Sequence, residues 1–133
     1  MQLPEELLVL SLHFSPDGKF LAASPWSDLK KESSVVVWDV ASGKQIAGSP
    51  FRVSRQNVAD LAFSPNSKIL ATIDHNNGIF ESAVTVAIGF WDLTKSQRIG
   101  ELKLLFSQGS LASMAFSPDC HILAIGLAGN NGG

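Results

Sequence analysis

Short apolar runs alternate with compact polar turns along the 133 residues of the chain. Three runs end in phenylalanine, at 10–14, 58–63 and 111–116, and after one turn a second run follows each, at 20–23, 69–73 and 122–125. Apolar runs of this length between clusters of Pro, Asp, Asn and Gly are typical of β-strands, and no stretch shows the spacing of an amphipathic helix. The pattern predicts an all-β chain.

The turn that separates each pair of strands is copied three times. Residues 14–18 read FSPDG, residues 63–67 read FSPNS and residues 116–120 read FSPDC, with spacings of 49 and 53 residues. Proline sets φ in such a turn, and the Asp or Asn side chain caps it. The copies predict one supersecondary unit repeated along the chain.

A second landmark follows the same period. A Trp-Asp pair at 38–39 returns 53 residues later at 91–92, and a tight turn and a fourth predicted strand follow each pair. We divide the chain into a first unit at 8–53, a second at 54–106, an incomplete third at 107–129 and a Gly/Asn-rich tail at 130–133. The repeat positions are Phe14, Pro16, Trp38, Asp39, Phe63, Pro65, Trp91, Asp92, Phe116 and Pro118.

This unit resembles the WD-repeat β-propeller, whose blades are four-stranded antiparallel sheets that end their third strand in Trp-Asp. The resemblance spans residues 8–127 and implies a partial propeller of about two and a half degenerate blades. A closed propeller needs at least about four blades. Either further blades belong to a longer chain, or several copies associate to close a ring. The first alternative is favoured, because symmetric closure normally uses whole blades.

The family's internal hydrogen-bonded tetrad of His, Ser or Thr, Asp and Trp is incomplete here. Thr72 fits the hydroxyl position in the second unit only, no His stands at the family position, and Glu32 and Thr85 replace the turn Asp. The resemblance therefore implies that this polar network is missing and that the blades depend on apolar packing.

Two other departures concern single positions. The turn residues Gly18 and Gly43 are replaced in later units by Ser67, Cys120 and Ser96. If these positions keep a left-handed backbone, each replacement costs about 1 kcal/mol. His13 stands before Phe14 where the other units have alanine. A His crowds a blade face unless the neighbouring blade is absent or unusual, so it indicates that the first unit lies at an end of the array.

The amino-acid composition limits the classes of partner that the chain is expected to bind. The chain has 10 basic and 12 acidic residues, a net charge of −2 and 45% hydrophobic residues. With this charge balance the chain has no basic surface that would bind the phosphates of nucleic acid. Pro and Gly interrupt its apolar runs, which argues against membrane-spanning segments. The single Cys120 suits a reducing compartment, and no basic segment precedes the apolar run at 7–10. We expect a cytoplasmic protein with protein partners.

The sequence offers few candidates for catalytic or metal-binding residues. Cys120 and His121 are neighbours whose side chains would point to opposite faces of a strand, so they form no nucleophilic pair. Asp74, His75 and Glu81 match no established metal-ligand spacing, and residues 75–78 are interpreted as a solvated Asn-Gly loop. We expect no enzyme activity, metal site or cofactor.

The resemblance implies a noncatalytic scaffold that binds proteins through its loops. The connections at 24–34 and 74–83 are long, and each sets apolar residues among charged ones, as binding hot spots do. Alternatively, their aromatic side chains fold back over their own blade. The candidate partner-binding residues are Trp26, Leu29, Lys30, Lys31, Arg55, Gln56, Ile79 and Phe80. Two alternative functions remain: the propeller segment of a prolyl oligopeptidase-like hydrolase, and a structural remnant without binding activity.

Overall fold

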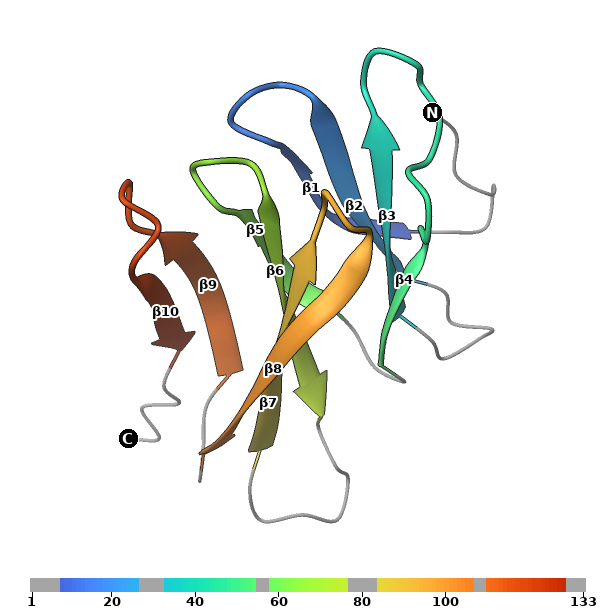
Figure 1. Ribbon diagram of the computed structural model, residues 1–133. Coiled ribbons are helices and arrows are strands. Elements are labelled where there is room, and N and C mark those ends of the chain that lie inside the picture. The colour runs from blue at the N-terminus through green and yellow to red at the C-terminus, as the bar shows by residue number, and fades with distance from the viewer. Residues whose placement is uncertain (1–7, 27–32, 55–57, 77–83, 107–109, 129–133) are drawn as a thin grey trace.

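The computed structural model describes residues 8–26, 33–54, 58–76, 84–106 and 110–128. Within these ranges every regular element is a β-strand, in agreement with the predicted all-β class. The first sheet has the order β1 (Leu8–Phe14), β2 (Phe20–Trp26), β3 (Ser33–Asp39) and β4 (Phe51–Ser54). The second has the order β5 (Val58–Phe63), β6 (Ile69–Asn76), β7 (Val84–Asp92) and β8 (Gln97–Phe106), and the third pairs β9 (Ser110–Phe116) with β10 (Leu123–Ala128) (Figure 1).

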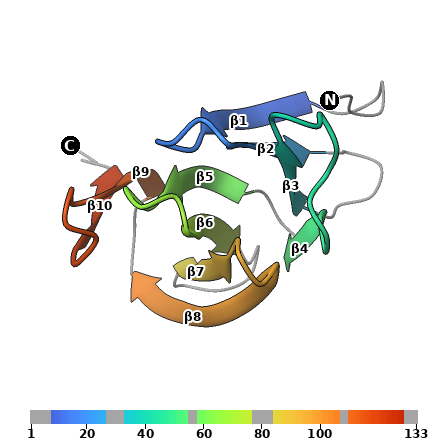
Figure 2. The ribbon, with the colours of Figure 1, turned by 45° about the horizontal axis from the view of Figure 1, so that its top comes forward.

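The three sheets stack face to face as blades. Each is antiparallel and follows the chain order from its first strand outward. The first strands are neighbours in space, because β1 lies beside β5 and β5 lies beside β9 (Figure 2). We call the sheets blade one (β1–β4), blade two (β5–β8) and blade three (β9–β10). This is the arrangement of a partial propeller.

Two apolar layers hold the stack together, one in each gap between blades. Residues directly opposite in paired strands share a face, so period-two alternation sends one set of side chains to each neighbour. The first layer joins Ala22, Val35, Val37 and Phe51 to Val58, Leu61, Phe63, Leu70, Trp91 and Leu93. The second joins Ala71, Ile73, Val86 and Ile88 to Met114, with Phe116, Leu123 and Ile125 packed against them. Each large side chain fully buried here contributes about 1.5–3 kcal/mol.

The three copied turns adopt one geometry. In the first, the Ser15 hydroxyl accepts a hydrogen bond from the backbone N–H of Phe20 and donates to Asp17. The same bonds recur from Ser64 and Ser117. The left-handed backbone expected at the glycine positions is confirmed, with φ of 59° at Ser67, 64° at Cys120 and 52° at Ser96.

Several strand boundaries differ from the sequence expectations. The expected loops at 24–34 and 74–83 are shorter, because β2 extends through Trp26 and β6 through Asn76. His75 and Asn76 therefore pair with β7 instead of forming a solvated loop. Cross-strand partners, which local turn chemistry does not reveal, lengthen these strands.

The fourth strand also differs between the two complete blades. In blade two, β8 begins at Gln97 directly after the turn, as expected. In blade one the turn leads only to an isolated bridge between Trp38 and Gln45, and β4 starts at Phe51. The backbone of Ser49 intervenes in a turn with Ile46, and the Ser49 hydroxyl accepts the N–H of Val37. A side chain thus replaces part of the missing ladder.

Candidate interaction surfaces

The connections between strands divide into two rims. The copied turns, together with those after β3 and β7, lie on one rim, which we call the turn rim (Figure 1). Antiparallel pairing places the end of β2, the start of β3, the end of β4 and the start of β5 on the opposite rim, and the same holds in blade two. We call this second edge the loop rim.

The predicted partner-binding residues belong to connections that leave and re-enter strands at the loop rim. Trp26 is the last residue of β2, where its backbone pairs with Leu8 and Ser33, so it is a strand residue and not a loop residue as expected. The other seven lie outside the described residues: Leu29, Lys30, Lys31, Arg55, Gln56, Ile79 and Phe80. Their grouping into one binding site stays a prediction.

The aspartates of the copied turns on the turn rim already have hydrogen-bond partners. The Ser15 hydroxyl and the backbone N–H of Lys19 donate to Asp17 and lower the pKa of its carboxyl below the usual 3.8. Hydrogen bonds from Ser117 and from the His121 backbone lower the pKa of Asp119 in the same way. These carboxylates are engaged in holding turns, which is a structural role.

The Trp-Asp strands show the same use of a carboxylate. Asp39 accepts the backbone N–H of Ser42, and Asp92 accepts both the hydroxyl and the backbone N–H of Thr94. These bonds lower the pKa of both aspartates. The Asp of the repeat therefore closes the turn into the fourth strand.

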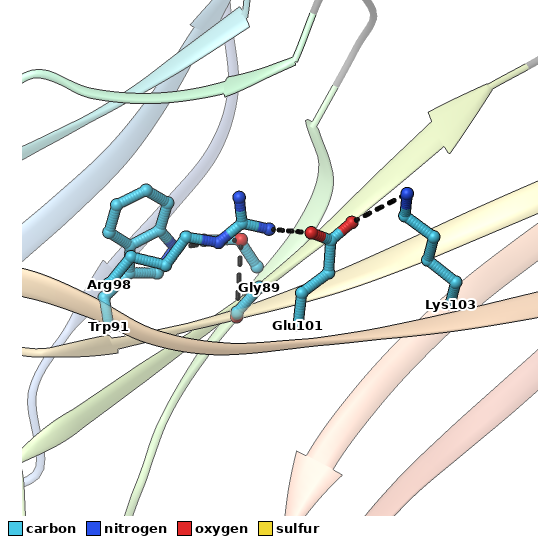
Figure 3. A network of polar contacts seen from close by, with 6 residues as sticks. Gly89, Trp91, Arg98, Glu101 and Lys103 are labelled. Atoms are coloured by element: carbon cyan, nitrogen blue, oxygen red, sulfur yellow. Dashed lines mark hydrogen bonds and ion pairs between the residues drawn. The ribbon is translucent and has the colours of Figure 1, made fainter.

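Trp91 is the centre of a mixed polar and aromatic cluster (Figure 3). Its ring stacks on Phe51 of blade one with centroids 4.7 Å apart, and the Arg98 guanidinium lies 5.6 Å from the ring centroid. Its indole N–H donates to the Thr72 hydroxyl over 3.2 Å. A Cβ at Gly89 would stand 2.9 Å from that hydroxyl oxygen, so only glycine fits beside the pair.

The expectation that the internal polar network is missing is therefore wrong for blade two. The Trp91–Thr72 hydrogen bond keeps two of its members, and Arg98 extends it to Glu101 over 2.8 Å and onward to Lys103 over 3.8 Å (Figure 3). In blade one, Ala23 occupies the position of Thr72 and supplies no hydroxyl. The prediction of apolar packing holds there, where Trp38 packs against Ala23 and Val36.

Asp60 connects the first strands of all three blades, a feature that the sequence analysis missed. Its Oδ2 accepts the backbone N–H of Met114 over 3.1 Å, and its Oδ1 accepts the N–H of Leu61 over 2.9 Å. The same Oδ1 lies 3.7 Å from Nε2 of His13. The available signal was an Asp at a repeat position where the other units have serine, at 11 and 113.

Of the two explanations for His13, an absent or an unusual neighbouring blade, the structure supports the second. His13 pairs with Ala22 across β1 and β2, and Ala22 belongs to the apolar layer shared with blade two. The His side chain is thus on the face that has a neighbour, where it meets Asp60 and stays half exposed. A polar partner on the facing strand compensates for the crowding.

Neither catalytic candidate gains support from the geometry. Cys120 and His121 lie in a turn and not in a strand, and His121 Nδ1 lies 3.5 Å from Asp119. Among the described residues, no three His, Cys, Asp or Glu side chains gather as metal ligands would, and Glu81 is outside that set. In the same part of the chain no helix is long and apolar enough to cross a membrane.

Comparisons with known proteins agree with the blade architecture. The chain is similar in structure to the hydrazine synthase of Kuenenia stuttgartiensis, with a TM-score of 0.70 and 23% identity over 87% of this chain and 36% of that one. The β-propeller domain of the Trilobed protease from Pyrococcus furiosus is similar with a TM-score of 0.59 and 20% identity, over 79% of this chain and 31% of that one. A prolyl endopeptidase is similar with a TM-score of 0.61 and 18% identity, over 92% of this chain and 19% of that one.

The chain thus spans about a fifth to a third of the length of these structures, and their identities establish the fold alone. No curated protein sequence matches it significantly. Residues 5–39 match the family model described as WD domain, G-beta repeat. This match identifies a WD repeat at the first repeat, and the stacked blades show the β-propeller fold.

Proposed function

We propose that the chain is a noncatalytic WD-repeat module that binds protein partners through its loop rim. The observation that carries this proposal is the placement of strand ends. The two apolar layers hold the blades in one stack, and the connections after β2, β4 and β6 all leave that stack on one rim. A packed scaffold that presents several connections side by side is a common basis for recognition.

The residues in these connections have the composition of a binding surface. Trp26 ends β2, and Lys30 and Lys31 follow it in sequence, while Ile79 and Phe80 stand in the connection after β6. Aromatic anchors rimmed by charge dominate the binding energy of many protein interfaces. The turn rim is less suited to this role, because its carboxylates already serve the turns.

Affinity capture with matched variants of the purified chain tests this proposal. We expect Trp26→Ala, Phe80→Ala and the double change Lys30→Glu with Lys31→Glu each to reduce recovery of a captured protein at least tenfold. Lys44→Glu with Lys95→Glu, on exposed residues of the turn rim, is the control and leaves recovery unchanged. Equal recovery by all variants would contradict the proposal, and no specific capture by the wild type would favour a structural remnant.

A hydrolase propeller is the second candidate, because the structural neighbours include propellers of a protease and of a prolyl endopeptidase. In that case the chain would border a catalytic domain. The sequence of the full polypeptide that contains this chain discriminates between the two functions. A Gly-x-Ser-x-Gly segment in that polypeptide, with a serine that a fluorophosphonate probe labels, supports the hydrolase. We also propose a cytoplasmic location, on the basis of the single cysteine. A cell-fractionation experiment that recovers the protein outside the cytoplasm would contradict it.

A further inference from the structure

The outer edge of blade two is a long strand that is paired on one side. β8 is the last strand of its sheet and pairs with β7. Among the described residues, no backbone group is hydrogen-bonded to its other edge. With ten residues β8 is the longest strand in this part of the chain, whereas β4, the outer strand of blade one, has four. Short edge strands are one way in which proteins prevent edge-to-edge pairing, and blade two lacks this protection.

This edge lies on the circumference of the stack. The first strands β1, β5 and β9 are neighbours at its centre, and β8 is at the opposite side of its own sheet (Figure 2). Adjacent blades pack on the faces of a sheet, as the two apolar layers show. A neighbouring blade can therefore cover a face of β8 but not its edge, whatever the number of blades.

The backbone chemistry of the edge selects the kind of occupant. An N–H and a C=O point outward at every second residue of an edge strand, and another extended backbone satisfies such a row. The pairing of β8 with β7 is irregular at one place, where Ile99 is the extra residue opposite Phe90 and Trp91. The register is continuous beyond it. The regular part of the edge is therefore residues 100–106.

Side chains along this regular part separate into a charged face and an apolar face. Glu101 and Lys103 stand two positions apart and share one face, whereas Leu102 lies on the other, opposite Ile88 of the second apolar layer. Glu101 is 2.8 Å from Arg98, while Nζ of Lys103 is 3.8 Å from Glu101 and its side chain is 69% exposed (Figure 3). The Lys103 ammonium is thus the less engaged charge of the cluster.

The order Glu-Leu-Lys is self-complementary in an antiparallel pair. When two copies of β8 meet about a two-fold axis at Leu102, Glu101 of each copy lies directly opposite Lys103 of the other. Directly opposite residues share a face, so two opposite-charge pairs form on the charged face and Leu102 meets its own copy on the apolar face. Leu104 then lies opposite Gly100, whose missing side chain leaves space for it.

Charge also distinguishes this register from its neighbours. A two-fold axis at Glu101 or at Lys103 would set like charges directly opposite each other, which destabilises a strand pair. An axis at Leu104 would leave both charges without a charged residue across the axis. The axis at Leu102 is the one that places both charges opposite a charge of the other sign.

We propose that the occupant of the β8 edge is β8 of a second copy of this chain, paired antiparallel about Leu102. The contact joins two stacks at their circumference and does not close a ring. It goes beyond the proposed loop-rim binding and does not rest on it. A strand of a different protein would satisfy the same backbone groups, but the opposite charges on either side of Leu102 favour a copy of the same strand.

Sedimentation and light scattering of the purified chain test the inference. We expect a dimer that dissociates on dilution. Glu101→Lys and Lys103→Glu each turn both opposite-charge pairs into like-charge pairs, and each raises the dissociation constant at least about tenfold. Lys68→Glu is the matched control, because this exposed lysine on the turn rim of the same blade undergoes the same change of charge away from β8. It leaves the dissociation constant unchanged.

Combining the two reversals tests the register. The double variant Glu101→Lys with Lys103→Glu again sets opposite charges across the axis and recovers the dimer, and a mixture of the two single variants forms a heterodimer. Far-UV circular dichroism verifies that each variant is folded, as expected for substitutions at exposed sites. A wild-type chain that stays monomeric at every concentration would overturn the proposal, and so would a double variant that dimerises no better than the single ones. The first outcome would leave an extended segment of a different protein as the occupant of the edge.

Discussion

The backbone N–H of Asp17 donates a hydrogen bond to the hydroxyl of Ser67 over 3.1 Å, and this bond joins the copied turns of blades one and two. Ser67 is buried and has a positive φ, a conformation that disfavours residues with a Cβ. The side chain therefore has a use that offsets its backbone cost. Cys120 and Ser96 share the conformation, but no inter-blade hydrogen bond of this kind is seen for either among the described residues.

Glycine substitution at these three positions separates strain from bonding. We expect Cys120→Gly and Ser96→Gly each to raise the free energy of unfolding by about 1 kcal/mol, because glycine relieves the left-handed backbone. Ser67→Gly gains the same relief but loses a hydrogen bond of about 1 kcal/mol, so its net change is near zero. Urea unfolding followed by circular dichroism measures all three. Equal stabilisation by all three variants would contradict the bonding role of Ser67.

The indole–hydroxyl pair of blade two gives a second prediction. Thr72→Val keeps the shape of the side chain but leaves the buried indole N–H of Trp91 without its acceptor, which costs about 2 kcal/mol of unfolding free energy. Thr72→Ser keeps the oxygen and removes one methyl group, for a cost of about 0.8 kcal/mol. A smaller loss in the valine variant than in the serine variant would argue against the hydrogen bond.

The carboxylate of Asp60 is predicted to hold blade three against blade two. Asp60→Asn replaces one accepting oxygen with a donor, and we expect a loss of about 1–2 kcal/mol with faster hydrogen exchange at the Met114 amide, by about tenfold. His13→Gln is the comparison. The His13–Asp60 pair is longer and half exposed, so its removal costs less than about 0.5 kcal/mol. Unchanged exchange at Met114 in the Asn variant would show that this hydrogen bond does not limit opening.

Stability in acid follows from the turn aspartates. Their folded pKa lies below the usual 3.8, so their contribution is complete above that value and is lost as the pH falls through the folded pKa. Asp17→Asn and Asp119→Asn keep an accepting oxygen, as Asn66 does in the second turn, but do not titrate in this range. We expect them to flatten the decline of stability between about pH 4 and pH 2.

The reverse change supplies the control for that prediction. Asn66→Asp adds a third carboxylate to an equivalent turn and is expected to steepen the decline over the same pH interval. Unfolding by urea at a series of pH values measures each slope. Identical slopes in the wild type and all three variants would show that these turns do not contribute to acid sensitivity.

Much of the fold was predictable because the repeat is written in local chemistry. The Phe-Ser-Pro turns predict the three hairpins, and the period of the Trp-Asp pairs predicts the four-stranded units, since turn residues act through their own backbone. The left-handed positions at 67, 96 and 120 followed from alignment with Gly18 and Gly43. A glycine in one repeat thus predicts the backbone conformation at the matching position of another repeat, and a single hairpin offers no such comparison.

Features that depend on facing blades were not predictable in the same way. Asp60 reaches Met114 across 54 positions of sequence, and the stacking of Phe51 on Trp91 joins different blades. The long extensions of β2 and β6 likewise depend on their partner strands. A side chain's face can be inferred from alternation, but its contact on the next sheet requires the geometry of the stack.

The two-sided carboxylate of Asp60 also fixes the order of the modules. Because serine stands at the corresponding sites 11 and 113, neither outer repeat can replace the middle one without forfeiting its link to the following sheet. A circularly permuted or shuffled gene built from these repeats would therefore be less stable than the native arrangement, although every module in it is unaltered. The repeats are similar in sequence, but the middle one cannot be exchanged for an outer one without a loss of stability.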